Sequence, residues 1–339
     1  MIKKCATFVQ SGGVVVKKEA TEDVRIDKTL VKKTGIKGFF KKVYKYRAFL
    51  LMLAPAVIYT LIFSYYPMTG IVLAFKKYTY AGGIWGSDWN GLENFRFFFT
   101  SGQAAEVTRN TVLYNVAFII TNTVLQIAVA VFLTEIKNKK FRKVSQSLMF
   151  LPYFISWVIV GVMAFNIFSS DYGFLNRVIE FFGGEAIPFY TTPWVWPLII
   201  MFFNLWKNIG YGSVMYLAAI MGIDTSIYEA AAIDGANVFQ RIFKVTIPSI
   251  MPTTIILLLL AVGGIFKGNF DMFYNLVGNN GILHPYTDVI DTLTTRALLG
   301  GANLGMTAAI GFYQSVLCFV TILIVNKLVK LYDKDYALF

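Results

Sequence analysis

A stripe of polar residues lies inside one long apolar segment of the chain. Its members share the helical spacing i, i+3, i+4, i+7 and are Asn204, Lys207, Asn208 and Tyr211. A helix places them on one face, where their amide, ammonium and phenol groups suit sugar hydroxyls. A lysine at mid-membrane depth is costly, so it must face a bundle interior or a wet cavity. The stripe therefore lines a solute path, or Lys207 is structural and snorkels or pairs with a carboxylate such as Asp271.

Two neighbouring segments could complete such a site. Tyr153 and Trp157 stand four residues apart in the preceding apolar segment. Lys267, Asn269 and Asp271 follow the next apolar segment along the chain. Aromatic rings present apolar faces on which the C–H faces of a sugar can stack. Most aromatic residues of such a chain pack or face lipid, so only rings that converge with the stripe indicate a binding site.

A short polar segment lies between two strongly apolar stretches. It reads Tyr228-Glu229-Ala230-Ala231-Ala232-Ile233-Asp234-Gly235-Ala236 and is followed by Val245-Thr246-Ile247-Pro248. The alanines favour a helix, whose start is predicted by the capping-box spacing of Ser226 and Glu229 and whose end is predicted by Gly235. Pro248 predicts the end of a second short helix. The segment must face water, where a partner can bind it, or it is an ordinary connector between two spans.

Several kinds of chemistry are missing from the sequence. There is no G-x-x-x-x-G-K-[ST] loop, G-x-S-x-G elbow or H-E-x-x-H helix, so we expect neither ATP binding nor an enzyme active site. His284 is the one histidine, so we expect no metal site. Cys5 and Cys318 are expected to be free thiols in different environments. The positive net charge has no accompanying nucleic-acid motif, so no nucleic-acid partner is expected.

The elements that position these groups are membrane spans. The chain is 56% hydrophobic and only 15% charged, against roughly 25% charged in soluble proteins. A span needs about 20 mostly apolar residues. We predict an all-α polytopic membrane protein with six spans, at residues 48–75, 111–134, 147–168, 193–221, 250–266 and 307–325.

The basic residues predict the orientation of these spans. Of the 31 lysines and arginines, 23 lie in the first 47 residues, the 135–146 loop, the polar segment and the tail. The positive-inside rule places all four regions, and both termini, in the cytoplasm. The predicted organisation is a basic segment 1–47 with an interfacial helix at 37–47, a six-span transmembrane domain 48–327 with a loop at 222–248, and a tail 328–339.

The polar segment also resembles a family signature. Glu229, Ala230, Ala231 and Gly235, followed by Val245-x-Ile247-Pro248, are similar to the E-A-A-x-x-x-G-x9-I-x-L-P motif of ABC-importer permeases. Further similarities are Gly91-Leu92-x-Asn94-Phe95, Leu151-Pro152, Asn269-Phe270-Asp271-x-Phe273, and Asp288-Val289-Ile290-Asp291-Thr292 with Arg296. From about residue 48 to 335 the chain resembles carbohydrate ABC importer permeases of the binding-protein-dependent, MalF/LplB-like family.

The resemblance implies a fold, partners and roles for residues. It implies the type I ABC importer permease fold, in which a cytoplasmic coupling helix contacts an ATPase through Glu229, Ala230, Ala231, Asp234, Gly235 and Pro248. It implies a sugar path lined by Tyr153, Trp157, Asn204, Lys207, Asn208, Tyr211 and Asn269. The implied partners are a second homologous permease, two copies of an ABC ATPase that binds the ATP, an extracellular or periplasmic binding protein, an oligosaccharide and the lipid bilayer of a bacterial cell membrane.

Two departures from the family pattern stand out. Asp224 occupies the place of the usual proline before the coupling helix, and we expect it to start that helix instead. Gly278-Asn279-Asn280-Gly281 replaces a Gly-Gly-Pro turn, which leaves the docking surface for a binding protein open. Two alternatives remain: a permease for another solute such as glycerol phosphate, and a membrane scaffold or sensor without transport activity.

Overall fold

The computed structural model describes residues 43–301 and 304–332, which divide into two units between Tyr66 and Pro67. The described part of the first unit contains helix α2 (Arg47–Thr60), with Pro55 inside it, and the π-helix η2 (Leu61–Tyr65). The apolar run continues through the 3₁₀ helix η3 (Tyr66–Phe75). Residues 1–42 lie outside the description, and with them most of the predicted interfacial helix at 37–47.

The second unit is almost entirely helical. Its first half comprises β1 (Lys76–Lys77), α3 (Gly83–Gly86), β2 (Asp88–Trp89), α4 (Glu93–Thr100), α5 (Gln103–Glu135), α6 (Lys139–Phe150), η4 (Leu151–Phe154), α7 (Trp157–Phe168), α8 (Phe174–Phe181), η5 (Phe189–Thr191) and η6 (Pro193–Val195). Its second half comprises α9 (Trp196–Met221), α10 (Thr225–Ile233), α11 (Val238–Arg241), η7 (Ile242–Thr246), α12 (Ile247–Gly263), α13 (Phe270–Val277), α14 (His284–Thr287), α15 (Ile290–Leu299) and α16 (Leu304–Tyr332). The strands β1 and β2 pair antiparallel, with Lys76 opposite Trp89.

Four helical runs among the described residues are long and apolar enough to cross a membrane: Arg47–Phe75, Gln103–Glu135, Val238–Gly263 and Leu304–Leu331. The pair Lys139–Phe154 and Trp157–Phe168 adds a fifth if it counts as one bent span. Helix α9, with 26 residues, is long enough at ~1.5 Å per residue, but its polar stripe makes it less apolar. The predicted all-α membrane fold is confirmed, and the count of six spans remains a prediction that fits it.

The third predicted span, at 147–168, is not one continuous helix. It is broken after η4 and bends by 94°. Pro152 supplies no N–H, and Ile155 and Ser156 are extended, with ψ of 130° and 152°. The Ser156 hydroxyl then caps α7 by accepting from the Ile159 N–H at 3.4 Å. The break places Tyr153 in η4 and Trp157 at the start of α7, so the two residues lie on different helices.

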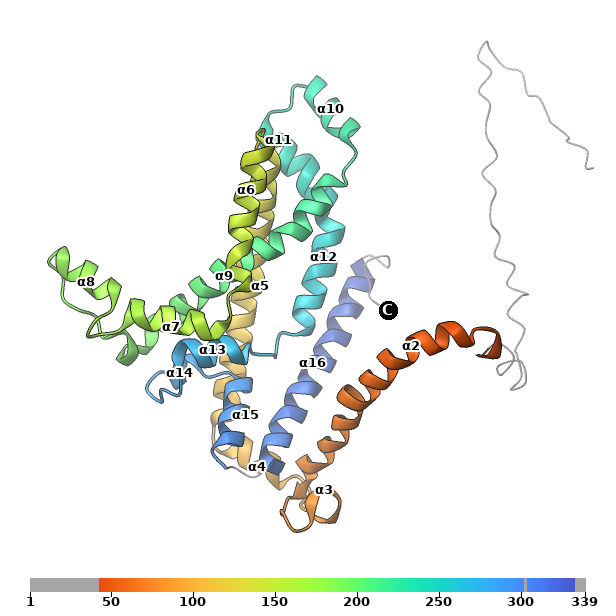
Figure 1. Cartoon of the computed structure of the whole chain (residues 1–339), viewed down its shortest axis with the longest axis vertical. Helices are drawn as coiled ribbons and strands as arrows, with labels where there is room; N and C mark the ends of the chain where they lie inside the picture. Colours follow the sequence, from red (N-terminus) through yellow and green to blue (C-terminus); the bar gives the residue numbers. More distant parts are fainter. Residues whose placement is uncertain (1–42, 302–303, 333–339) are drawn as a thin grey trace, which may run out of the picture. The chain divides into compact units, whose positions relative to one another are not determined.

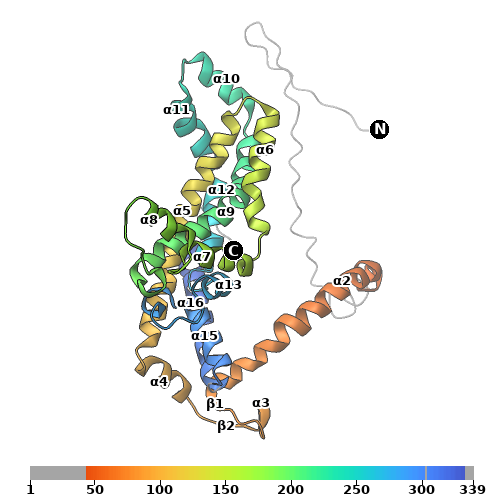
Figure 2. The same cartoon turned by 60° about the vertical axis from the view of Figure 1, so that its left-hand side comes forward.

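Helices α5 and α9 lie side by side, and the polar stripe lies in this central pair (Figure 1; Figure 2). One apolar cluster joins α5, α7, α9 and α13 through Tyr114, Val160, Ile200 and Met272. A second joins α5, α9 and α12 near the other end of the bundle. Helices α10 and α11 stand beyond that end of the bundle (Figure 1; Figure 2).

The motif Gly91-Leu92-x-Asn94-Phe95 has a structural explanation. Gly91 adopts φ +60°, a conformation that other residues rarely adopt. The buried Asn94 amide then donates to the carbonyls of Ala74 and Lys76, at 2.9 and 3.0 Å. These bonds satisfy carbonyl groups at the end of η3 and fix α4 against it.

Candidate functional site

The Lys207 side chain is buried against the break in the third predicted span. Its Nζ donates to the carbonyls of Pro152 and Tyr153, at 3.3 and 2.7 Å, and to that of Ile155. It also lies 5.7 and 5.3 Å from the ring centroids of Tyr153 and Trp157. The Pro152 carbonyl also accepts from the Ile155 N–H, at 3.2 Å. The ammonium therefore chiefly satisfies the Tyr153 and Ile155 carbonyls, which the interrupted helix leaves without amide donors.

A glycine makes this contact possible. A Cβ at Gly210 would lie 1.8 Å from the Met149 carbonyl oxygen, so only glycine lets α6 approach α9 this closely. The ring of Tyr153 stacks on that of Tyr211 on α9, with centroids 4.1 Å apart. The pairing of Lys207 with Asp271, one of the sequence interpretations, is not present between these two described residues. Lys207 instead has the backbone of the break as its partner.

Two recesses lie along the polar stripe. The first, which we call the α13 recess, has a volume of about 570 Å³ and is lined by Asn115, Phe118, Asn204, Lys267, Gly268, Asn269, Phe270, Asp271, Met272 and Phe273. The second, the α12 recess, has about 350 Å³ and is lined by Phe118, Ile119, Asn122, Thr123, Gln126, Asn208, Tyr211, Gly212, Met215, Tyr216, Leu257 and Ala261. They share Phe118, so they adjoin along α5.

The structure distributes the predicted path residues over three places. Asn204 and Asn269 line the α13 recess. Asn208 and Tyr211 line the α12 recess. Lys207, Tyr153 and Trp157 lie together at the break and line neither recess.

Helix α5 contributes polar residues that the sequence interpretation missed. Asn115 and Asn122 are seven residues apart, and Gln126 follows four later, so they lie on one face within an apolar span. The isolated amides in such a span are the signal that could have identified them. Asn115 donates to the Ile265 and Lys267 carbonyls, each at 3.0 Å, where α12 has ended.

Asn122 has an unusual environment. Its Nδ2 donates to Asn204 Oδ1 at 2.8 Å. Its own Oδ1 is buried and has no donor among the described residues. Buried acceptors are normally satisfied, and an exception in the wall of a recess identifies a position where a ligand hydroxyl or a water can donate.

The polar segment between spans forms the predicted helix, with two corrections, at its start and at Pro248. Helix α10 starts at Thr225, and its N-cap is Asp224, whose carboxylate accepts from the Ser226 N–H at 2.9 Å. Hydrogen bonds from Ser226 hold the pKa of Asp224 below its ordinary value of 3.8. The expected start at Ser226 and Glu229 is therefore wrong, whereas the expected role of Asp224 as the starting residue is confirmed.

Gly235 ends α10 as expected. It has φ +74°, and its N–H and that of Ala236 donate to Ala232 and Ala231, at 3.1 and 2.9 Å. This is a Schellman arrangement, in which a left-handed glycine satisfies the last carbonyls of a helix. Pro248 does not end a helix. It is the second residue of α12, and η7 runs into α12 without a break.

The polar segment at 222–248, which we call the coupling segment after the family motif that it resembles, is largely exposed. Glu229, Ala230, Asp234, Gly235 and Pro248 are exposed, and Ala231 is half-buried. Apolar side chains accompany them, and Ile233 and Phe239 are 87% and 72% exposed. The Tyr228 and Thr246 hydroxyls bond at 2.9 Å, which ties α10 to η7. An ordered helix with uncovered apolar side chains is suited to contact with another protein.

The sequence profile described as "Binding-protein-dependent transport system inner membrane component" matches residues 126–334. The chain belongs to this family. It is 32% identical to the Polygalacturonan/rhamnogalacturonan transport system permease protein YteP of Bacillus subtilis, over 91% of this chain and 96% of that protein. It is 32% identical to Protein LplB of the same organism, over 84% of this chain and 89% of that protein.

A solved structure agrees with this assignment. The chain is similar to one in a bacterial ABC transporter involved in the import of the acidic polysaccharide alginate, with a TM-score of 0.78, 31% identity and coverage of 86% of this chain and 97% of that chain. The predicted resemblance is thus confirmed. The protein is a multi-pass inner-membrane permease of a bacterial ABC importer, and its family is one of transport subunits.

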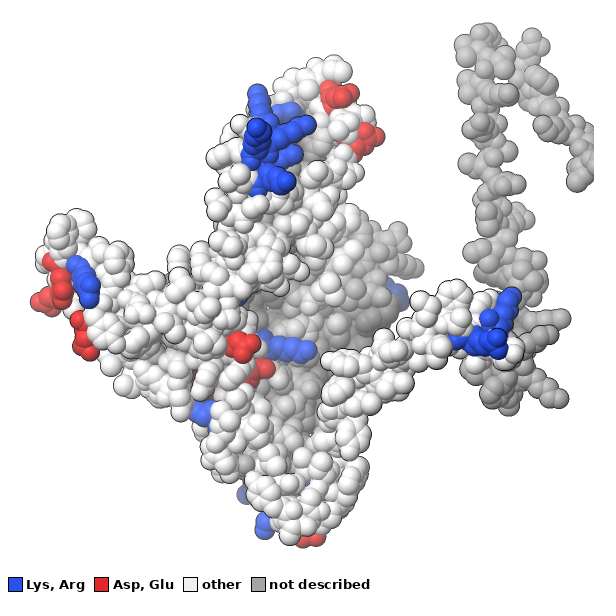
Figure 3. All heavy atoms as spheres, viewed as in Figure 1, with Lys and Arg blue, Asp and Glu red and all other residues white. Residues whose placement is uncertain are grey.

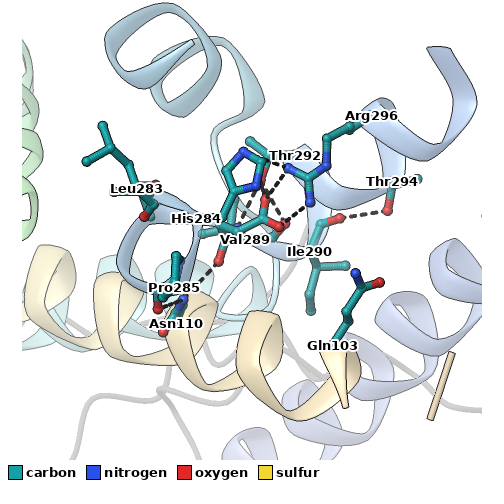
Figure 4. Close-up of polar contacts among 12 residues, drawn as sticks. Gln103, Asn110, Leu283, His284, Pro285, Val289, Ile290, Thr292, Thr294 and Arg296 are labelled. Atoms are coloured by element: carbon teal, nitrogen blue, oxygen red, sulfur yellow. Dashed lines mark hydrogen bonds and ion pairs between the residues drawn. The ribbon is translucent and has the colours of Figure 1, made fainter. Parts of the chain in front are cut away.

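A third pocket, of about 320 Å³, lies beside α13, α14 and α15. Figure 4 shows the polar contacts among residues around it. Both Arg296 terminal nitrogens donate to the Asp288 carboxylate, and Thr292 donates to the same carboxylate at 2.6 Å. Asn110 on α5 donates to the Pro285 and Asp288 carbonyls, each at 3.1 Å. The Asp288–Thr292 motif with Arg296 therefore forms an ion pair that fixes these short helices to the bundle.

His284 belongs to this cluster. Arg296 Nη1 lies 3.2 Å from its Nε2 and can only donate, so Nε2 accepts and the ring is neutral with its proton on Nδ1. Burial and then the Arg296 charge lower the pKa of His284 from its ordinary value of 6.5. Across the described ranges, no group of three or more His, Cys, Asp or Glu side chains could hold a metal ion.

Proposed function

We propose that this permease conducts an oligosaccharide through the α13 and α12 recesses. Three similar proteins have names or titles that state sugar polymers or oligomers: a polygalacturonan/rhamnogalacturonan permease, the arabinooligosaccharide permease AraP of Halalkalibacterium halodurans and an alginate importer. The recess walls combine amides with aromatic rings, which provide hydrogen bonds to hydroxyls and stacking against C–H faces.

The observation that carries this proposal is the unpartnered Oδ1 of Asn122 in the wall of the α12 recess. A sugar hydroxyl can donate to it while the ring lies against Phe118 or Tyr211. Asn204, Asn208, Tyr211 and Asn269 then act as path residues. Lys207, Tyr153 and Trp157 hold the broken helix behind them and position the path without contacting the sugar.

The alternatives receive less support. A phosphate substrate such as glycerol phosphate favours several cationic groups in the path, and Lys267 is the one cation lining either recess. A scaffold or sensor without transport activity needs neither the adjoining α13 and α12 recesses nor an exposed coupling segment.

We propose that transport requires the partners expected for this family. The coupling segment, through Glu229, Ala230, Ala231, Asp234, Gly235 and Pro248, contacts one of two ABC ATPase subunits, which bind the ATP. The permease itself needs no cofactor. A second permease completes the path, and an extracellular or periplasmic binding protein delivers the sugar. The similarity to a structure solved together with an alginate pentasaccharide-bound periplasmic protein supports this last partner. Both termini are then cytoplasmic.

Substitution of recess amides tests the proposal. Asn122→Ala and Asn208→Ala should each reduce sugar uptake about 2- to 10-fold, the range for losing one neutral hydrogen bond. Uptake of labelled oligosaccharide in proteoliposomes measures the effect, and co-purification measures assembly. Phe202→Ala serves as the control, because Phe202 is on α9 but is 59% exposed and lines neither recess. An assembled double variant with unchanged uptake would show that the recesses are not the path.

A further inference from the structure

Helix α6 carries a cationic face that the transport path does not use. Lys139, Arg142, Lys143 and Gln146 have the spacing i, i+3, i+4, i+7 and share one side of the helix. Figure 3 shows basic side chains gathered over this end of α6. The two ion pairs found within residues 43–301 and 304–332 involve neither these lysines nor Arg142. The face therefore carries uncompensated positive charge.

This face borders a pocket with an apolar opposite wall. The pocket, which we call the α6–α9 recess, has a volume of about 440 Å³ and is lined by Lys139, Arg142, Lys143, Gln146, Val214, Leu217, Ala218 and Met221. Arg142 and Gln146 are half-buried in it, whereas Lys139 and Lys143 are exposed at its rim. An occupant must therefore combine an anionic group with an apolar part.

The position of the recess along the bundle narrows the choice. Helix α6 begins with basic residues and ends with Leu148, Met149 and Phe150, so its first turns lie where a span leaves the apolar layer. The same end of the bundle carries the coupling segment (Figure 1). Basic side chains at the cytoplasmic boundary, next to a groove between spans, match the phosphate of an inner-leaflet lipid.

We propose that the α6–α9 recess binds the headgroup of an anionic phospholipid. Lys139, Arg142 and Lys143 donate to the phosphate, and the Gln146 amide donates to an oxygen of the glycerol ester region. The apolar wall from Val214 to Met221 contacts the upper part of an acyl chain. A soluble anion satisfies the cations but leaves this wall uncovered. An acidic protein surface is the rival occupant, and the experiment separates it.

The test uses the whole importer complex in nanodiscs of phosphatidylcholine, titrated with fluorescent phosphatidylglycerol. The variant K139Q/R142Q/K143Q should weaken phosphatidylglycerol binding about 100-fold, because each of the three cations contributes about fivefold near an anionic lipid. The matched control is K137Q/K140Q/K244Q, which removes the same charge from the same end of the bundle but from residues that do not line the recess. We expect less than about threefold weakening in the control.

Five results would overturn the proposal. Equal weakening in both variants would mean diffuse attraction to the membrane, and unchanged binding in the recess variant would mean that no headgroup lies there. Displacement of the lipid by millimolar inorganic phosphate would identify a free-anion site. Loss of the ATPase on co-purification, with lipid binding intact, would identify a protein contact. If the triple variant does not assemble, a non-saturable phosphatidylglycerol titration of the wild-type complex would equally refute a defined site.

Discussion

In both the coupling segment and the break at Lys207, side chains bond to backbone groups at helix ends. The two regions differ in how far along the chain the bonded residues are. In the coupling segment, Asp224 bonds Ser226 and Asn237 bonds Gln240, so each helix end is satisfied by a near neighbour. At the break, the Lys207 ammonium reaches carbonyls 52 to 55 positions earlier. The first region is determined by local sequence and the second by tertiary packing, so they should respond differently to substitution.

The largest effect is expected from Lys207→Met. The Tyr153 and Ile155 carbonyls lose their donor, which should lower the free energy of unfolding by about 2–6 kcal/mol, because each buried acceptor left without a partner costs about 1–3 kcal/mol. Thermal unfolding of the purified permease and recovery of the assembled complex measure the loss. Lys267→Met is the control, because Lys267 is exposed. A Lys207→Met complex that is stable but has lost uptake would place the ammonium on the substrate instead.

Gly235→Val should have the next largest effect, on coupling rather than on insertion. The Schellman turn needs φ +74°, and a left-handed conformation costs an ordinary L-residue roughly 1–2 kcal/mol, more when it is β-branched. A Cβ at this position meets nothing within 4 Å, so backbone strain is the cause. Sugar uptake and stimulated ATPase activity should fall while membrane insertion is intact. Gly235→Asn, which tolerates this conformation, should retain most activity, and a fully active valine variant would contradict the assignment.

The cluster around His284 combines both kinds of bond. Its bonds to Arg296 are local, whereas the bond from Asn110 to Asp288 is long-range. The pKa of His284 is lower in the folded state than its ordinary value of 6.5. Below about pH 6.5 the unfolded chain therefore binds more protons than the folded one, and folding stability falls as the pH is lowered through this window. The melting temperature should drop by a few degrees between pH 7 and pH 5.

His284→Gln isolates this contribution, because glutamine can accept from Arg296 but does not titrate. The variant should show a smaller decrease in melting temperature over the same range. Burial raises the pKa of Asp291 above its ordinary value of 3.8. The folded chain therefore binds more protons at this carboxyl than the unfolded chain does, so Asp291 adds stability as the pH falls, opposite to His284. An identical pH profile in wild type and variant would remove His284 from the explanation.

The smallest effect is expected from Asn237→Ala. Asn237 caps the four-residue helix α11 through a capping box with Gln240, and losing such a cap costs about 1 kcal/mol. Faster hydrogen exchange should be confined to the amides of α11, with the melting temperature of the bundle unchanged. Asn237→Ser should retain protection. A global loss of stability would show that the coupling segment is less autonomous than its local bonds indicate.

This contrast explains which features could be predicted from the sequence. Apolar length and helical spacing predicted the membrane fold, and glycine and capping chemistry predicted the coupling segment to within a residue or two. The break at Ile155 and Ser156 was missed, because hydropathy cannot distinguish a straight span from one bent around a neighbour. The partner of Lys207 was missed for the same reason, since it is a backbone 52 to 55 residues away that Gly210 lets approach. The amides of α5 could have been predicted, because polar residues spaced along one face of an apolar span indicate a buried or functional site.

The π turn η7, which joins α11 to α12, sets the rotation of α10 and α11 about the axis of α12. Each residue in an α-helix turns the chain by about 100°, and a π turn accommodates one residue beyond the regular repeat. Deleting one residue from Ile242–Thr246 would rotate everything before it relative to the span by about that angle. Thr246, which bonds Tyr228 from inside this turn, holds the chosen angle. The side of α10 that can contact a partner protein is thus determined by how many residues η7 contains, as well as by which side chains α10 carries.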